Sequence, residues 1–204
     1  MRDLWSLNVP VTDAQKTKCC QFAERAGALG NRRGVYDLGR AEYKKRLEVP
    51  LGFLKQSLVR GKKVKRICAE FISDHTQLCL EMIDVIEDLI PIVRRQALIG
   101  NPNAMTDNCF MSLGIVYPTA QPQLMHCDAD GDITHVCAIP MTDFQGQGDT
   151  EFGENLFILK GPKMWNGIIE HRGGANGSEH TRVTLFFVLD SKDVDFANPG
   201  NSFY

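Results

Sequence analysis

The sequence predicts an α+β protein in which helices come first and a run of strands follows. Up to about residue 105, apolar residues recur at the three- and four-residue steps of a helix. Beyond it, short apolar runs alternate with Gly, Pro, Asp and Asn, which is the pattern of strands joined by turns. Helices followed by strands indicate a β core with helices packed on it. We expect one structural domain with an N-terminal helical region (1–104), a core (105–191) and a C-terminal tail (192–204).

The first expected helix lies in the stretch TDAQKTKCCQFAERAGALG. Thr12 or Asp13 is the candidate N-cap, because side chains of this kind accept hydrogen bonds from the free amides of the first turn. Gly30 is the candidate C-cap. Cys19 and Cys20 fall within the helical pattern, so we expect them in the core rather than in a redox site.

A second and stronger helix is expected from Val64 to Leu89. Pro91 should end or kink it, since proline cannot donate the amide hydrogen bond of a helix interior. A loop is expected over residues 100–104. The apolar face of this helix combines Ile67, Phe71, Leu78, Met82, Val85 and Leu89.

Five short apolar runs after residue 105 are expected to form the strands of the core. They are CFMSLGIVY, HVCAIPM, NLFILKG, WNGIIEH and TRVTLFFVL. The loops 100–108 and 143–153 are candidates for substrate selection. Within the second, the glycine-rich stretch QGQGDTEFGEN is expected to be either a mobile lid or a plain hairpin loop.

The composition is that of an ordinary globular chain. Its 204 residues are 43% hydrophobic, and the formal net charge of −2 gives no general attraction to nucleic acid or membranes. The sequence shows no membrane-spanning run and no signal-peptide core, and its seven cysteines follow no disulfide framework. We therefore expect the cytoplasm or the nucleus. One basic cluster, RGKKVKR at 60–66, is either a solvated helix start or a patch facing nucleic acid.

The stretch HCDADGDITH is the most concentrated group of metal-binding residue types in the chain. Asp128, Asp130 and Asp132 match the first ligand positions of an EF-hand calcium loop. That loop also needs Gly at its sixth position and Glu at its twelfth, where this chain has Ile133 and Ile139. A structural zinc site needs four ligands, commonly paired as CxxC or HxxxH, and neither pair occurs here. An EF-hand calcium loop is therefore excluded, and structural zinc held by this stretch alone is disfavoured.

His126 and Asp128 fit another kind of metal site. In an extended segment their side chains share one face, while Cys127 points to the other face into packing. A second histidine would complete the two-histidine, one-carboxylate set that binds non-haem Fe(II) and leaves coordination positions open. His171, at the end of the run WNGIIEH, is the candidate for that ligand.

Arg182 and Thr184 open the strongest strand pattern and should face the same side of it. A planar guanidinium beside a hydroxyl is suited to bind a carboxylate. With this pair, the sequence resembles the 2-oxoglutarate- and Fe(II)-dependent oxygenases over about residues 109–190. The family pattern HxD…H…RxT reads here as His126 and Asp128, then His171, then Arg182 and Thr184.

The resemblance has a second part and an alternative assignment. Tyr117 stands where prolyl-hydroxylase-like members carry a tyrosine that contacts the cosubstrate, and the run beginning at His171 resembles the HxG turn of those members. Alternatively, His180 is the last metal ligand and Lys192 the carboxylate binder. We prefer His171 and Arg182, because Lys192 lies among acidic residues beyond the strand and His180 lies in a polar turn.

The other singled-out residues receive structural interpretations. We expect His135 at a strand end or next to a ligand, and His75 on the surface or in packing. Trp165 is expected to pack rather than to stack on a substrate. Asp130 and Asp132 are expected in a turn, where one could still orient His126.

What the resemblance implies is a double-stranded β-helix, a jelly roll shared with cupins, that holds Fe(II) through His126, Asp128 and His171. It implies that Arg182 and Thr184, with Tyr117, bind 2-oxoglutarate, and that O2 is consumed as the cosubstrate becomes succinate and CO2. The product would be a hydroxylated or oxidatively demethylated C–H group. Halogenases of the family lack the acid found here at position 128, so halogenation is disfavoured.

Three other classes stay open. They are a cupin-like metal-binding protein, a metal-dependent hydrolase or isomerase that does not use 2-oxoglutarate, and a purely structural domain. Within the oxygenase interpretation the substrate is a protein side chain, a modified nucleobase or a small metabolite. DNA-repair demethylases of the family carry RxNxTxR on the strand that here reads RVTLFFVL, which counts against a nucleobase.

Overall fold

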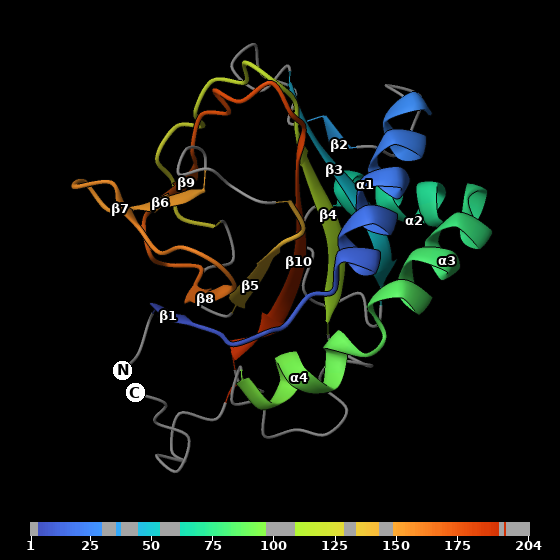
Figure 1. Ribbon diagram of the computed structural model, residues 1–204, viewed down its shortest axis with the longest axis horizontal. Coiled ribbons are helices and arrows are strands. Elements are labelled where there is room, and N and C mark those ends of the chain that lie inside the picture. Colours follow the sequence, from blue (N-terminus) through green and yellow to red (C-terminus); the bar gives the residue numbers. More distant parts are fainter. Residues whose placement is uncertain are drawn as a thin grey trace.

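The computed structural model describes residues 4–29, 36–37, 45–53, 62–96, 109–128, 134–142, 149–191 and 194. Within them the chain forms a large sheet and a small sheet, and helices cover the face of the large sheet that points away from the small one (Figure 1). Both sheets are antiparallel. Two antiparallel sheets packed face to face, with helices outside, confirm the α+β jelly-roll prediction.

Helix α1 (Asp13–Ala28) begins where the sequence predicts. The Thr12 hydroxyl accepts a hydrogen bond from the Gln15 amide, and the Gln15 side chain accepts one from the Thr12 amide, which completes a capping box. Cys19 is buried in the core, as expected, and all seven cysteines are free. Gly30 lies outside the described residues.

The prediction of a single long helix from Val64 to Leu89 is wrong. The segment forms two helices, α2 (Lys62–Asp74) and α3 (Thr76–Ile86). His75 between them has φ −129° and ψ 33°, outside the helical region. Residues 73–76 are Ser, Asp, His and Thr, which are poor helix formers, and the Thr76 hydroxyl donates to the Ile72 carbonyl. The helix therefore breaks at its weakest local sequence.

Pro91 does not end a helix but lies in the first turn of helix α4 (Leu89–Gln96). The amides of a first turn have no partner within the helix, so a proline is tolerated there. Among the described residues, no helix combines the length and apolar character needed to cross a membrane. The basic cluster falls partly in α2, where Arg66 pairs with Glu70 at 3.6 Å, and the loop 100–108 lies outside the described residues.

The large sheet draws strands from both halves of the chain. Its spatial order is β1 (Leu4–Ser6), β8 (Lys163–Asn166), β5 (Thr134–Pro140), β10 (Arg182–Asp190), β4 (Phe110–Val116), β3 (Arg46–Phe53) and β2 (Tyr36–Asp37). Three of these strands, β1, β2 and β3, lie within residues 1–104, where the sequence analysis expects helices. β3 carries Pro50 and Gly52 at a register shift, and such residues hide a strand from pattern analysis.

The small sheet is short and has the order β7 (Phe157–Ile158), β6 (Thr150–Phe152) and β9 (His171–Gly173). The expected strand WNGIIEH is split between β8 and β9, so His171 begins a strand instead of ending one. Of the glycine-rich stretch, the described part forms β6 and the turn toward β7, in which Gly153 has φ 64°. This part is a hairpin, while residues 143–148 lie outside the described residues.

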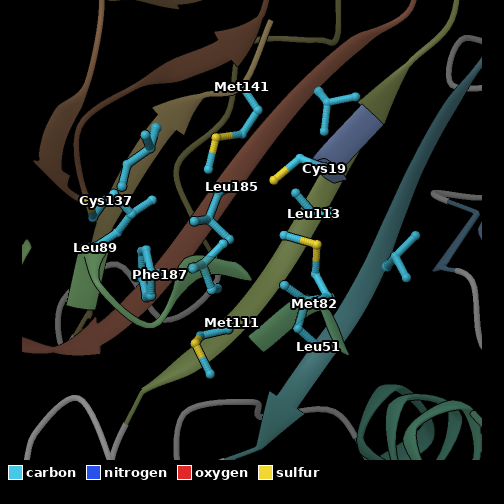
Figure 2. Close-up of a cluster of buried hydrophobic side chains, with 14 of the residues drawn as sticks. Cys19, Leu51, Met82, Leu89, Met111, Leu113, Cys137, Met141, Leu185 and Phe187 are labelled. Atoms are coloured by element: carbon cyan, nitrogen blue, oxygen red, sulfur yellow. The ribbon is translucent and has the colours of Figure 1, made fainter. Parts of the chain in front are cut away.

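Strand β10 separates two environments by strict alternation. Its odd-numbered residues, including Leu185 and Phe187, pack under the helices in the main core, part of which Figure 2 shows. Its even-numbered residues, including Phe186 and Val188, face the small sheet, where Phe152 and Trp165 join them. Because side chains of a strand alternate between faces, Arg182 and Thr184 point to the same interior as Phe186. That interior contains the candidate site.

Candidate metal centre

His126 and His171 are brought together by the backbone. The two residues form an antiparallel bridge, in which the His126 amide donates to the His171 carbonyl at 3.0 Å and the reverse bond measures 2.8 Å. The Asp128 amide donates to the Gly167 carbonyl at 2.8 Å. The segment that carries His126 and Asp128 is therefore held by main-chain hydrogen bonds to the start of β9 and to the turn after β8.

Both imidazoles are oriented by main-chain carbonyls. Nδ1 of His126 lies 2.8 Å from the Leu124 carbonyl oxygen, and Nδ1 of His171 lies 2.7 Å from that of Ile169. These bonds require the proton on Nδ1 and leave the Nε2 lone pair of each ring for a metal. Orienting carbonyls of this kind are a regular feature of metal-binding histidines.

The three predicted ligands converge. One ligating atom from each of His126, Asp128 and His171 lies within 4.8 Å of the others, and His171 Nε2 is 3.7 Å from Asp128 Oδ1. Burial lowers the pKa of His171, the Asp128 charge partly opposes this, and the ring therefore favours the neutral, ligating form. Two imidazoles and a carboxylate on one side are the donor set of non-haem Fe(II) sites, so the residues present fit that metal.

Aromatic side chains support the second histidine. The Trp165 ring lies 5.3 Å from the His171 ring and 5.4 Å from the Phe152 ring, both in edge-to-face geometry. Trp165 is 2% exposed, so it packs as predicted. Cys127 points away from the ligands, as expected, but it is exposed rather than packed, and its thiol donates to the Ile168 carbonyl at 3.2 Å.

Arg182 is buried at the start of β10, on the interior side. Its guanidinium donates to the Ala175 carbonyl at 3.3 Å and to the Gly174 carbonyl at 3.4 Å. Burial, aided by the nearby charge of Arg46, lowers the pKa of Arg182 to about 10, which leaves it charged at neutral pH. Thr184 follows on the same face, as the sequence predicts.

Tyr117 is not brought into this group. Its ring packs against the helix-side core, and its hydroxyl lies where a side chain on Gly27 of α1 would be. Burial raises the pKa of this phenol. The residue follows Val116, whose neighbours across the sheet are Arg46 and Arg182, so the alternation of β4 turns Tyr117 to the opposite face.

The remaining histidines lie elsewhere. His180 is exposed in a turn and is absent from the described ligand group, which favours His171 as the last ligand. His135 is buried on β5, where its Nδ1 lies 2.8 Å from the Ser191 hydroxyl, and His75 stacks on Phe71 at 4.7 Å. The other singled-out candidates, Lys192, Asp130 and Asp132, lie outside the described residues.

Several polar residues of the interior were not identified by the sequence analysis. Arg46 of β3 donates to the Gln121, Gly173 and Gly174 carbonyls and so fixes the chain after β9. Buried Lys163 of β8 pairs with Asp149. Glu48 of β3 accepts a hydrogen bond from Ser112 of β4. Arg46, Glu48 and Pro50 alternate with apolar residues, and this two-residue period was the available sequence signal for strand β3. It stood in a region where the sequence predicts helices.

The comparisons with known proteins agree with this architecture. No protein-family model matches the sequence, and no curated protein matches it. Solved structures do match in fold. SnoN, a non-heme alpha ketoglutarate dependent epimerase from nogalamycin biosynthesis, superposes with a TM-score of 0.55 and 12% identity over 92% of this chain and 78% of that one.

Two prolyl hydroxylases match as well. The enzyme from Pseudomonas putida gives a TM-score of 0.52 at 10% identity, over 92% of each chain. The enzyme from Trichoplax adhaerens, solved with a peptide of the hypoxia inducible factor, gives 0.50 at 10% identity, over 97% of this chain and 88% of that one. The fold is that of 2-oxoglutarate- and Fe(II)-dependent oxygenases. Sequence identities this low establish the similarity of fold alone. The reaction has to be inferred from the residues of the candidate site.

Proposed function

We propose that the protein is an Fe(II)- and 2-oxoglutarate-dependent oxygenase that hydroxylates, or oxidatively demethylates, a C–H group. The observation that carries the proposal is the convergence of His126, Asp128 and His171 in a fold that such oxygenases share. SnoN, a neighbour at low identity, is solved in complex with Fe3+ and alpha ketoglutarate. A cupin-like binding protein would explain the ligands, but it gives no role to a buried arginine on the same interior face.

Each side chain has a distinct task in this proposal. His126, Asp128 and His171 would hold the metal through two Nε2 atoms and a carboxylate oxygen. Arg182 and Thr184 would bind the far carboxylate of 2-oxoglutarate by a charge-assisted hydrogen bond and a hydroxyl. Phe152 and Trp165 exclude water from the side of His171. The bound metal and cosubstrate supply the oxidation itself, which no amino-acid side chain can perform.

Asp128 favours hydroxylation within this class. The carboxylate lies beside His171 Nε2 and occupies a ligand position that a halide would need. Replacing Asp128 with Ala should abolish hydroxylation. Unchanged turnover in this variant would remove Asp128 from the metal site.

The first experiment is an anaerobic titration of the purified protein with Fe(II) and then 2-oxoglutarate, followed by visible absorption. We expect a charge-transfer band that requires both additions. Exposure to air should then form succinate. Tight metal binding without this band would favour the cupin-like or hydrolase alternatives.

A matched pair of variants tests the ligand assignment. His171→Ala should lose the band, while His180→Ala should keep it, because His180 is exposed in a turn away from the ligand group. The reverse result would make His180 the last ligand. Far-ultraviolet circular dichroism of both variants checks that each remains folded.

A further inference from the structure

Glu48 projects into the same interior as the proposed cosubstrate site. The register pairs Glu48 with Gly114 on β4, and Gly114 with Thr184 on β10. Residues opposite one another in antiparallel strands point to the same face. Glu48 and Thr184 therefore share a row, and Arg182 lies in the next row of that face.

The carboxylate is held in place by a buried hydroxyl. Ser112, which is 0% exposed, donates from Oγ to Glu48 Oε1 at 2.6 Å. Among the described residues this is the one hydrogen bond that the Glu48 side chain makes, so its second oxygen can accept another donor. Glu48 is absent from the described ligand group of His126, Asp128 and His171. It is therefore not part of the metal-binding group.

Glu48 also retains access to solvent. It is half-buried although its strand lies inside the sheet, between β4 and β2. An inward-facing side chain that stays partly accessible borders solvent within the interior. The nearby Asp128 carboxylate is close enough to raise the pKa of Glu48, although burial is the larger cause of the rise.

An aromatic ring lies over the residue that pairs with Glu48 on the neighbouring strand. A Cβ added to Gly114 would be 2.5 Å from Cε2 of Phe186, so the ring covers Gly114, the residue between Glu48 and Thr184. Phe186 is only partly buried. A carboxylate beside an aromatic face is a favourable pair for an organic cation, which gains a charge-assisted hydrogen bond and a cation–π contact.

We propose that Glu48, positioned by Ser112 and flanked by Phe186, binds a cationic group of the substrate, an ammonium or a guanidinium. The substrate class is then an amine- or guanidine-bearing molecule or side chain, with the oxidised C–H group close to the cation. This inference rests on the proposed oxygenase function and names the substrate class of the same site. Anionic substrates are disfavoured, because the Glu48 carboxylate repels them.

The test compares two probes of the same shape and different charge. Nα-acetyl-arginine amide carries a guanidinium, and Nα-acetyl-citrulline amide replaces it with a neutral urea. Each is titrated into the anaerobic Fe(II)–2-oxoglutarate protein, and the shift of the visible band gives its dissociation constant. We expect the arginine probe to bind about ten- to a hundredfold tighter, the size of one hydrogen bond to a charged partner.

Three variants separate recognition from structure. Glu48→Gln should keep the band and reduce the preference for the cation to about one. Ser112→Ala keeps the Glu48 carboxylate but removes the hydrogen bond that positions it. This variant should reduce the preference for the arginine probe only in part. Glu154→Gln removes the same charge from an exposed turn, and should leave the preference unchanged.

The outcomes distinguish this inference from the function on which it rests. Equal responses to the two probes, including no response to either, would overturn the role of Glu48 while the band still supports the oxygenase. A preference that survives in Glu48→Gln would also overturn it. A wild-type protein without the band would remove the proposed function first.

Discussion

His126 and His171 exchange both of their backbone hydrogen bonds, at 3.0 and 2.8 Å, so the two imidazole rings proposed to bind the metal are paired by the main chain itself. Their centroids are 4.7 Å apart. The bridge joins a segment before β5 to a strand directly after β8. The site is thus assembled by sheet pairing, and the metal has only to enter it.

Removal of the metal should leave the fold intact. Because backbone bonds and the carbonyls of Leu124 and Ile169 already hold the ligands, the metal-free protein should keep its circular dichroism spectrum. Adding metal at about a hundred times its dissociation constant should stabilise the protein by about 2.7 kcal/mol. Thermal unfolding with and without Mn(II) measures this gain. Unfolding on chelation would show instead that the metal builds the site.

Arg182→Ala should weaken 2-oxoglutarate binding and leave metal binding unchanged. Loss of one partner from a buried charge pair costs about 2–5 kcal/mol, equivalent to about thirtyfold or more in affinity. The cosubstrate titration of the Fe(II) protein measures this change. Arg172→Ala is the control. Arg172 follows His171 on β9, so its side chain points to the other face of the small sheet, where it pairs with Glu151 at 2.6 Å. Normal use of 2-oxoglutarate by Arg182→Ala would direct attention to Lys192.

Asp149→Asn should destabilise the protein. The Lys163 ammonium is 0% exposed and pairs with Asp149, and burial lowers the pKa of this lysine while Asp149 opposes that change. Removing one partner of a buried pair costs about 3–5 kcal/mol. Urea denaturation should show this loss, and addition of Lys163→Met should recover most of it. Failure of the second change to recover stability would mean that Asp149 acts through other neighbours.

Glu48→Gln should stabilise the metal-free protein at neutral pH. Burial raises the pKa of Glu48, the Ser112 hydrogen bond opposes the rise, and the Asp128 charge adds to it. Above the ordinary pKa of 4.5 the folded state thus binds more protons than the unfolded state, and wild-type stability falls as the pH rises through this window.

The glutamine carries no charge and still accepts the Ser112 hydrogen bond. Its advantage in urea denaturation should be present at pH 7 and should vanish below about pH 4, where the carboxyl is protonated in both states. An advantage of the same size at both pH values would contradict the electrostatic explanation. Glu154→Gln serves again as the exposed control.

Gly114→Ala should alter the interior surface beside Glu48. The new methyl group would lie 2.5 Å from the Phe186 ring, so the ring has to move. Overpacking of this kind costs about 1–3 kcal/mol. The variant should also weaken binding of the arginine probe, because the aromatic face is displaced. A stable variant with unchanged probe affinity would show that the ring adapts without consequence.

Local chemistry made parts of this protein predictable. The two-residue period of an extended chain puts His126 and Asp128 on one face, and the same period puts Arg182 and Thr184 together on β10. The capping box at Thr12 and the strands β4, β5 and β10 also follow from near neighbours. In each of these cases the deciding interactions connect residues within one element.

Other features depended on pairing between distant segments. The sequence favours His171 over His180 as the last ligand, and the bridge between His171 and His126 is the structural observation that supports this choice. Tyr117 follows β4 closely enough to suggest the site, yet the alternation of the strand turns it toward α1.

Strand β3 had no local signal strong enough to stand out from its helical surroundings, so Glu48 was not predicted. By itself, the sequence determined which residues can bind a metal or a carboxylate, since that is a property of side chains and local period. Only the tertiary structure decided which of them meet, because the register between strands is set by the burial of a whole sheet face.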